Sequence, residues 1–135
     1  LIKDCGLYKS KAKNLIATCQ ILVDRYHGEV PREFDQLVEL PGVGRKTANV
    51  VVSVLFGTPA IAVDTHVFRV SNRLKLGIAK TPEEMEQKLQ KAIPKKDWAA
   101  AHHWLIYHGR RLCKARKPLC NECFLNHLCP SAGKV

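Results

Sequence analysis

Apolar residues recur along most of the chain at the three- and four-residue intervals that place them on one face of a helix. The first such stretch covers residues 10–26 and is closed by Gly28. The next has Pro31 in its first turn and ends at Leu40, and a third runs from about Arg45 to Phe56. No segment alternates with period two for long enough to predict a strand. We therefore expect an all-α fold.

Capping residues mark the helices of the second half. Asp64 follows a short extended segment and is placed to cap a helix that Gly77 ends. Thr81 begins the sequence Thr-Pro-Glu-Glu, which combines a capping box with proline at the first helical position. Pro94 ends that helix, and Asp97 is placed to cap the last long one.

The sequence Leu-Pro-Gly-Val-Gly-Arg-Lys-Thr-Ala, residues 40–48, separates the second and third predicted helices. Its proline and glycines stop one helix and allow the backbone to turn sharply into the next. Such a hairpin points backbone N–H groups outward at the positively polarised start of the following helix, which suits an anion and above all a phosphate. We expect a helix–hairpin–helix unit over about residues 33–56, with Lys46 just past the turn.

The charge of the chain favours a polyanionic partner. Its 135 residues carry 22 Lys and Arg against 12 Asp and Glu, a formal net charge of +10. This balance favours nucleic acid first and an anionic membrane surface second, and no apolar run approaches the roughly 20 residues of a membrane span. The chain begins at Leu1, in what looks like mid-domain sequence, so we expect a truncated chain.

Four cysteines near the C-terminus have the spacing C-x6-C-x2-C-x5-C: Cys113, Cys120, Cys123 and Cys129. Four thiolates this close can enclose one metal centre. Disulfides are one alternative, although thiols stay reduced in an intracellular setting. Structural zinc and an iron–sulfur cluster are the others, and ligand chemistry alone leaves these two open. Cys5 and Cys19 lack such spacing, and we expect both to be small buried hydrophobic residues.

Lys46 and Asp64 are the candidate reactive groups, and each also has a plainer role. A lysine beside a phosphate-binding hairpin could simply bind the phosphate. Alternatively, an amine that is partly desolvated and near another cation, here Arg45, loses its proton more easily and can attack a sugar carbon to form a Schiff base. Asp64 could be a helix cap alone, or could cap the helix and also act on Lys46.

The hairpin sequence, followed by Val-Asp-Thr-His at residues 63–66, resembles the helix–hairpin–helix DNA glycosylases, and most closely their endonuclease III branch. The cysteine spacing agrees with that branch independently. The resemblance implies two helical lobes with a cleft, with the N-terminal helices of the family missing from this chain. We place the hairpin lobe in residues 1–58 and the second lobe, which ends in the cluster segment 113–129, in residues 59–135. It also favours a [4Fe–4S] cluster, held by the four cysteines, over zinc.

The same resemblance implies roles for individual residues. Lys46 would be the nucleophile, and Asp64 would assist its deprotonation and stabilise positive charge on the sugar. Leu7 matches an apolar wedge that fills the gap left by a flipped nucleotide, although a buried helix-cap leucine is the alternative. The basic loop between the first two cluster cysteines would contact phosphate, or would be a solvated run of charge. The expected DNA contacts are Leu7, Gly42, Val43, Gly44, Arg45, His66, Lys114, Arg116 and Lys117.

These observations predict a bifunctional DNA glycosylase/AP lyase of base-excision repair. It would remove oxidised or damaged pyrimidines from duplex DNA and cut 3′ to the abasic site by β-elimination. A monofunctional adenine or thymine mismatch glycosylase and a non-catalytic DNA-binding module are the alternatives. We expect double-stranded DNA as the partner, no membrane, a monomer when full length, and an intracellular location in a bacterial-like cytoplasm or nucleoid. His102, His103, His108 and His127 are expected to be core or surface residues.

Overall fold

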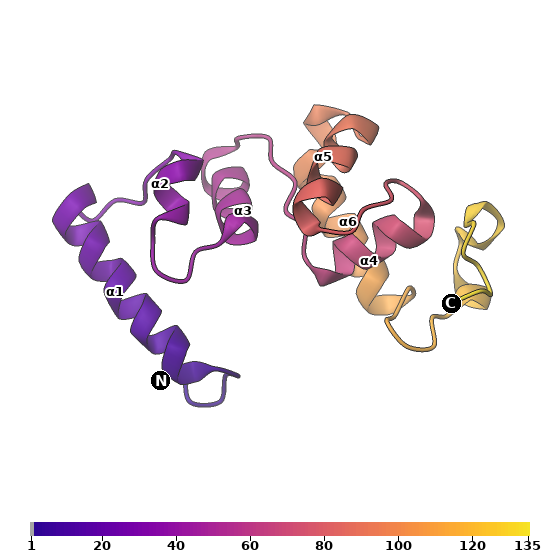
Figure 1. The fold of residues 1–135 in the computed structure, drawn as a ribbon, viewed down its shortest axis with the longest axis horizontal. Coiled ribbons are helices and arrows are strands. Elements are labelled where there is room, and N and C mark those ends of the chain that lie inside the picture. Colours follow the sequence, from indigo (N-terminus) through magenta and orange to yellow (C-terminus); the bar gives the residue numbers. More distant parts are fainter. Residues whose placement is uncertain (1) are drawn as a thin grey trace.

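The computed structural model describes residues 2–135, which divide into two groups of helices joined by an extended segment (Figure 1). The hairpin lobe consists of α1 (Tyr8–Tyr26), α2 (Phe34–Val38) and α3 (Arg45–Phe56). The C-terminal lobe contains α4 (Thr65–Leu74), α5 (Pro82–Ala92), the 3-10 helix η1 (Lys95–Asp97), α6 (Trp98–Arg111), and two further 3-10 turns, η2 (Cys120–Glu122) and η3 (Asn126–Leu128). No strand occurs within residues 2–135, and the all-α prediction is confirmed.

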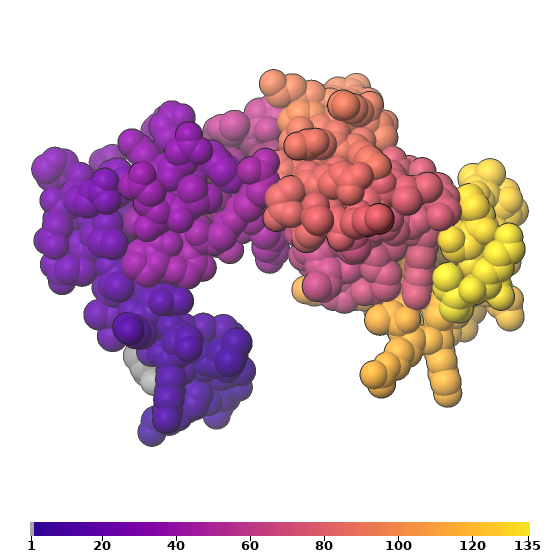
Figure 2. Space-filling view, viewed as in Figure 1, coloured from indigo at the N-terminus to yellow at the C-terminus, as the bar shows by residue number. Residues whose placement is uncertain are grey.

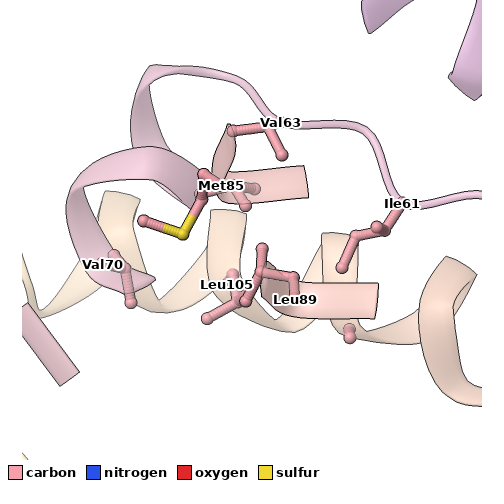
Figure 3. Close-up of a cluster of buried hydrophobic side chains, with 8 residues drawn as sticks. Ile61, Val63, Val70, Met85, Leu89 and Leu105 are labelled. Carbon is pink, nitrogen blue, oxygen red and sulfur yellow. The ribbon is translucent and has the colours of Figure 1, made fainter. Parts of the chain in front are cut away.

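Each lobe has its own hydrophobic cluster. The cluster of the hairpin lobe consists of Leu37, Leu40, Ala48, Val52 and Ala60. The cluster of the C-terminal lobe gathers side chains from α4, α5 and α6 with two from the joining segment (Figure 3): Ile61, Val63, Val67, Val70, Met85, Leu89, Ala101 and Leu105. Ala60 of the joining segment belongs to the first cluster and the next residue, Ile61, to the second, so this segment is anchored in both lobes.

The molecule is arched (Figure 2). The two lobes meet around α3 and the joining segment, and a hollow on one side separates the start of α1 from the C-terminal lobe. Within the described residues 2–135, no helix has the length and apolar character needed to cross a membrane.

Helix α1 lies at the edge of the hairpin lobe and buries none of its residues. Only its C-terminal part packs on the cluster of that lobe, through Ile21, Leu22 and Tyr26. Cys5 and Cys19 are both exposed, so the expectation that they are buried is wrong. The apolar period of α1 agrees with the prediction, but Leu15, Ile16 and Val23 on this helix are more than half exposed within the described residues.

Several details of the helix ends differ from the prediction, including the start of α1 at Tyr8 and the end of α2 at Val38. The second helix begins at Phe34, after Pro31, because Glu33 is still extended (φ −82°, ψ 135°). Helix α4 ends at Leu74, since Lys75 adopts a left-handed conformation (φ 60°) and its N–H bonds to the carbonyls of the last turn. Asp97 occupies the N-cap position of α6, but its side chain makes no capping hydrogen bond.

Gly77 serves packing and does not end α4. A Cβ at this position would lie 2.9 Å from the Cβ of Lys88 and 3.2 Å from the sulfur of Met85, both on α5. The glycine therefore allows the loop after α4 to approach α5 closely. The start of α5 is as predicted, because the Thr81 hydroxyl accepts a hydrogen bond from the Glu84 N–H over 3.2 Å.

Candidate active site

The turn between α2 and α3 is tight and leaves the start of α3 open. The N–H of Val43 donates to the carbonyl oxygen of Leu40 over 3.0 Å, and Gly42 adopts φ +76°. Gly44 is then extended (φ −93°, ψ 176°) at the N-cap of α3. Because glycine has no side chain to accept from the first N–H groups of α3, these groups are available for an anion.

Helix α1 supports one side of this hairpin. The Thr18 hydroxyl donates to the carbonyl oxygen of Pro41 over 3.0 Å. A Cβ on Gly42 would lie 2.6 Å from the side-chain nitrogen of Asn14, so this position requires glycine for space as well as for its positive φ. A Cβ on Gly44 would meet nothing within 4 Å. The hairpin is thus braced at Gly42 and open at Gly44.

Lys46 lies in the first turn of α3 and is exposed. The desolvation expected for its amine is therefore absent from this structure. Arg45, the neighbouring cation, is paired: its Nε and Nη2 each donate to Glu86 of α5 over 2.8 Å. This hydrogen bond raises the pKa of Arg45. The Arg45 guanidinium also lies 5.1 Å from the ring centroid of Phe34, and contact of Arg45 with DNA stays a prediction.

Asp64 ends the joining segment and begins α4. Its Oδ1 accepts a hydrogen bond from the N–H of Val67 over 2.8 Å, so the capping role is confirmed. The three residues ahead of it, Ile61, Ala62 and Val63, are buried, which fixes the backbone that carries this carboxylate. Asp64 itself is half-buried, and it therefore combines a defined position with access to solvent.

The buried imidazole of His102, on α6, has a pKa that the charges of Asp64 and Lys46 both influence. Burial lowers the pKa of His102, and a hydrogen bond to the backbone of Ala62 opposes that effect. The Asp64 carboxylate raises the same pKa and the Lys46 ammonium lowers it. Both charges therefore act on one side chain at the junction of the two lobes.

The four C-terminal cysteines surround one cavity of about 20 Å³. All six cysteines of the chain are free thiols. Around the cavity, Arg73 of α4 donates to the sulfur of Cys113 over 3.4 Å, and His108 of α6 lies 3.8 Å from the sulfur of Cys123. Four thiols facing a shared space, with a cationic donor on one of them, suit an iron–sulfur cluster. Among residues 2–135, no three His, Cys, Asp or Glu side chains converge as they would on a single metal ion.

Arg73 also holds the basic loop that follows the first cysteine. Its Nη1 donates to the carbonyl oxygen of Lys114 over 2.7 Å and its Nη2 to that of Ala115 over 3.1 Å. Lys114, Arg116 and Lys117 are exposed. The loop thus has a fixed backbone and free cationic side chains, the combination that a phosphate contact requires.

Two further candidates lie apart from the hairpin. Leu7 is 81% exposed at the N-cap of α1, so the alternative of a buried helix-cap leucine is wrong. His66 is half-buried on α4, where its Nδ1 lies 3.2 Å from Nη2 of Arg69. The wedge role of Leu7 and the cleft role of His66 stay predictions.

Sequence reasoning missed three side chains that organise this site: Arg73, Glu86 and His102. Glu86 is 41 residues from Arg45, and Arg73 is 40 from Cys113, so no local spacing connects the members of either pair. His102 had been assigned to core or surface, and its burial agrees with that assignment. Its contact with the carbonyl oxygen of Ala62, 40 positions away, could not be read from the pattern of α6.

Comparison with known proteins decides the family. Residues 1–95 match the HhH-GPD superfamily of base excision DNA repair proteins. The chain belongs to this superfamily. Residues 113–129 match the iron–sulfur binding domain of endonuclease III, a range that begins and ends at the first and last of the four cysteines. The predicted [4Fe–4S] cofactor is confirmed.

Relatives and solved structures of this superfamily share the fold of the chain. It is 56% identical over 128 residues to endonuclease III of Rickettsia conorii, which is 95% of this chain and 61% of the relative. A trapped endonuclease III–DNA covalent intermediate, in an estranged-adenine complex, has a TM-score of 0.93 at 54% identity, covering 98% of this chain and 63% of that one. A thermostable thymine-DNA glycosylase has a TM-score of 0.84 at 28% identity, covering 99% and 64%.

The predicted helix–hairpin–helix glycosylase fold is therefore confirmed. The chain spans about three fifths of the length of the relatives that it matches.

Proposed function

We propose that this chain carries the catalytic part of a bifunctional DNA glycosylase/AP lyase that removes oxidised or damaged pyrimidines from duplex DNA. The observation that carries the proposal is the placement of Lys46 and Asp64. The lysine lies in the first turn after an open hairpin, and both charges act on His102. An amine, a carboxylate and free backbone N–H groups are what this chemistry needs. Membership of the superfamily and likeness to endonuclease III agree with it.

Phosphate binding is assigned to the hairpin. The backbone N–H groups of Gly42 and Gly44, with those of the first turn of α3, would hold one phosphate of the damaged strand, while the N–H of Val43 is engaged within the turn by the carbonyl oxygen of Leu40. Arg45 would take part through its backbone N–H, because Glu86 engages two nitrogens of its side chain. This binding depends on no positively charged side chain of the hairpin, so Lys46 remains free to react.

The damaged nucleotide would leave the duplex and enter a cleft between the lobes, between Lys46 and Asp64. Leu7, exposed at the N-cap of α1, would fill the gap in the base stack. His66, two residues after Asp64, would line the entry to the same cleft. The loop of Lys114, Arg116 and Lys117 would hold a second part of the DNA backbone.

The reaction begins when the neutral amine of Lys46 attacks C1′ of the flipped sugar. A bond forms between Nζ and C1′, and the bond from C1′ to the base breaks, so that the base leaves with the electron pair. Asp64 takes the proton released from Nζ and stabilises positive charge on the sugar. The C1′–O4′ bond then breaks, its electron pair stays on O4′, and O4′ takes the proton back from Asp64, so that the opened sugar is left as a protonated Schiff base between Nζ and C1′. Loss of a proton from C2′ then expels the 3′ phosphate with the electrons of the C3′–O bond, which is β-elimination.

The four cysteines Cys113, Cys120, Cys123 and Cys129 are proposed as the cluster ligands. When bound, a [4Fe–4S] cluster would crosslink the C-terminal segment. The protein residues then do the rest: Arg73 donates to one thiolate and holds the basic loop in place. The cluster region would thus serve DNA binding, away from the bond that breaks.

The remaining assignments concern the whole protein. We propose a lobe boundary at residues 1–58 and 59–135, two residues ahead of the point where the two hydrophobic clusters divide, between Ala60 and Ile61. Double-stranded DNA is the proposed partner. The complete protein would act as a monomer inside the cell, in the cytoplasm or nucleoid.

Incubation with a duplex that contains thymine glycol, in the presence of borohydride, tests the proposal. Reduction of the Schiff base should give a covalent protein–DNA band on a denaturing gel. Lys46→Ala should lose this band and keep duplex binding, while Lys91→Ala, which changes an exposed lysine of α5, should keep both. Base release without a covalent band would identify a monofunctional glycosylase. We retain this alternative because the chain is also similar to a thymine-DNA glycosylase. Binding without either product would identify a non-catalytic module.

A further inference from the structure

His102 lies where α6 meets the joining segment between the lobes. Only 7% of this residue is exposed. Its Nδ1 lies 2.7 Å from the carbonyl oxygen of Ala62, two residues before Asp64. Because a carbonyl oxygen can only accept, Nδ1 carries the proton and donates it. The imidazole therefore ties the joining segment to α6 immediately ahead of the proposed catalytic carboxylate.

The same imidazole faces the helix that bears Lys46. A small cavity of about 10 Å³ separates α3 from α6, and His102 lines it together with Val50 and Ser53 of α3. Lys46, Val50 and Ser53 follow one another at helical spacing on one face of α3. His102 thus lies against the stripe of α3 that carries Lys46.

The proposed reaction assigns no proton transfer or covalent step to His102. Burial lowers its pKa, which favours the neutral ring with its single N–H directed at Ala62. The charges of Lys46 and Asp64 act on it from the two lobes. A buried, neutral imidazole with one fixed hydrogen bond is suited to holding other groups in place.

We propose that His102 is a positioning residue for the Lys46–Asp64 pair. By donating to Ala62, it fixes Asp64 relative to the face of α3 that carries the amine. The proposal rests on the proposed function.

Asp64 is held from two directions. On its C-terminal side, its own carboxylate accepts from Val67 over 2.8 Å. On its N-terminal side, His102 holds Ala62. Without the imidazole, the carbonyl oxygen of Ala62 would be buried without this donor, and the segment would shift to find another. A displacement of about 1 Å in a catalytic group can slow a reaction about 100-fold.

Two substitutions separate this role from simple packing. His102→Leu keeps an apolar side chain of similar bulk and removes the donor. His102→Asn keeps an N–H donor close to the position of Nδ1. His27→Asn, at an exposed histidine after the end of α1, is the control for the change of residue type.

The kinetic readout is the single-turnover rate of borohydride trapping on a duplex with an abasic site. We expect His102→Leu to slow trapping about 100-fold while the duplex affinity stays within about threefold of wild type. His102→Asn should recover at least tenfold of that loss, and His27→Asn should trap at the wild-type rate. Trapping by His102→Leu at the wild-type rate, or equal loss in the leucine and asparagine variants, would overturn the proposal.

A second readout does not depend on activity. Hydrogen exchange at the N–H of Val67, followed by NMR, reports the hydrogen bond that Asp64 makes. Relative to the N–H of Val70 in the interior of α4, protection at Val67 should fall about tenfold or more in His102→Leu and recover in His102→Asn. Unchanged protection in His102→Leu would overturn the positioning role. If wild-type protein traps no DNA, the proposed function fails instead, and exchange at Val67 still decides the role of His102.

Discussion

Arg45 and Glu86 join the two lobes through a bidentate ion pair. Nε and Nη2 of Arg45 donate to the two carboxylate oxygens of Glu86, each over 2.8 Å. Asn49, one turn further along α3, donates to the same carboxylate over 3.1 Å. The Glu86 side chain is 6% exposed and that of Arg45 48%. The beginning of α3, where the hairpin N–H groups and Lys46 lie, is therefore fixed to α5.

Glu86→Gln is expected to destabilise the protein for two reasons. It removes the negative charge opposite Arg45, and it replaces one of the two oxygens that accept from Arg45 with an amide nitrogen, which cannot accept. Breaking a fully buried pair costs about 3–5 kcal/mol, and the half-exposed guanidinium reduces this to about 2 kcal/mol of unfolding free energy. Urea denaturation measures the change.

The matched control is Glu84→Gln on the same helix, whose carboxylate pairs with Lys88 over 2.9 Å at the surface. Its effect on the urea midpoint should be clearly smaller than that of Glu86→Gln. Equal midpoints for the two variants would show that the pair between the lobes adds no more than a surface contact.

The iron content of the protein should depend on the four C-terminal cysteines and not on Cys5 or Cys19. The native protein should contain about four irons per chain, as a single [4Fe–4S] cluster requires. Cys120→Ser should lower this content and the stability of the segment. Cys19→Ser, which changes an exposed thiol of α1, should retain the full content. Metal analysis of anaerobically prepared protein decides this, and stoichiometric zinc without iron would contradict the prediction.

Duplex binding should weaken steeply with salt, and the loop of Lys114, Arg116 and Lys117 should account for part of that dependence. Changing all three to glutamine is expected to flatten the slope of log affinity against log salt by up to about three units. The control is a triple glutamine variant at Lys91, Lys95 and Lys96, which are also exposed but lie on α5 and η1. An unchanged slope in the loop variant would mean that these side chains only face solvent.

His102 should make stability depend on pH on the acid side of neutrality. Burial lowers its folded-state pKa from the ordinary value of 6.5, so the unfolded chain binds the proton at a higher pH than the folded one. Its contribution is therefore complete above pH 6.5 and decreases as the pH falls through the window below.

Urea unfolding of wild type and His102→Asn between pH 7.5 and 5.5 tests this dependence. The variant cannot take up the proton, so its stability relative to wild type should improve as the pH falls. Since burial also lowers the pKa of His108, part of the acid sensitivity should remain in both proteins. If the unfolding free energies of wild type and His102→Asn changed with pH in parallel, His102 would not contribute to the pH dependence of stability.

Features that depend only on residues close together in the sequence could be predicted from the sequence. The hairpin, the Asp64 cap and the limits of α3 follow from glycine, proline and capping chemistry within a few positions, and all three are present. The limit of this reasoning appears at α1. Its apolar period is real, but periodicity cannot say whether anything packs against it, and Cys19 is exposed as a result.

Contacts between distant residues were beyond the sequence. Arg45 looked like a phosphate ligand or an electrostatic neighbour of Lys46 because its pairing with Glu86, 41 positions away, leaves no trace in local spacing. The contact of His102 with Ala62 spans 40 positions and was equally hidden. Both contacts lie at the junction of the lobes, where the relative placement of the proposed catalytic groups is determined.

Arg73 gives the C-terminal segment a property that neither of its parts has alone. One guanidinium donates both to the sulfur of Cys113 and to the backbone of the basic loop, so the two sites share a single conformational equilibrium. Thermodynamic linkage makes such coupling reciprocal. To the extent that an intact cluster strengthens DNA binding, bound DNA must protect the cluster from loss by the same factor.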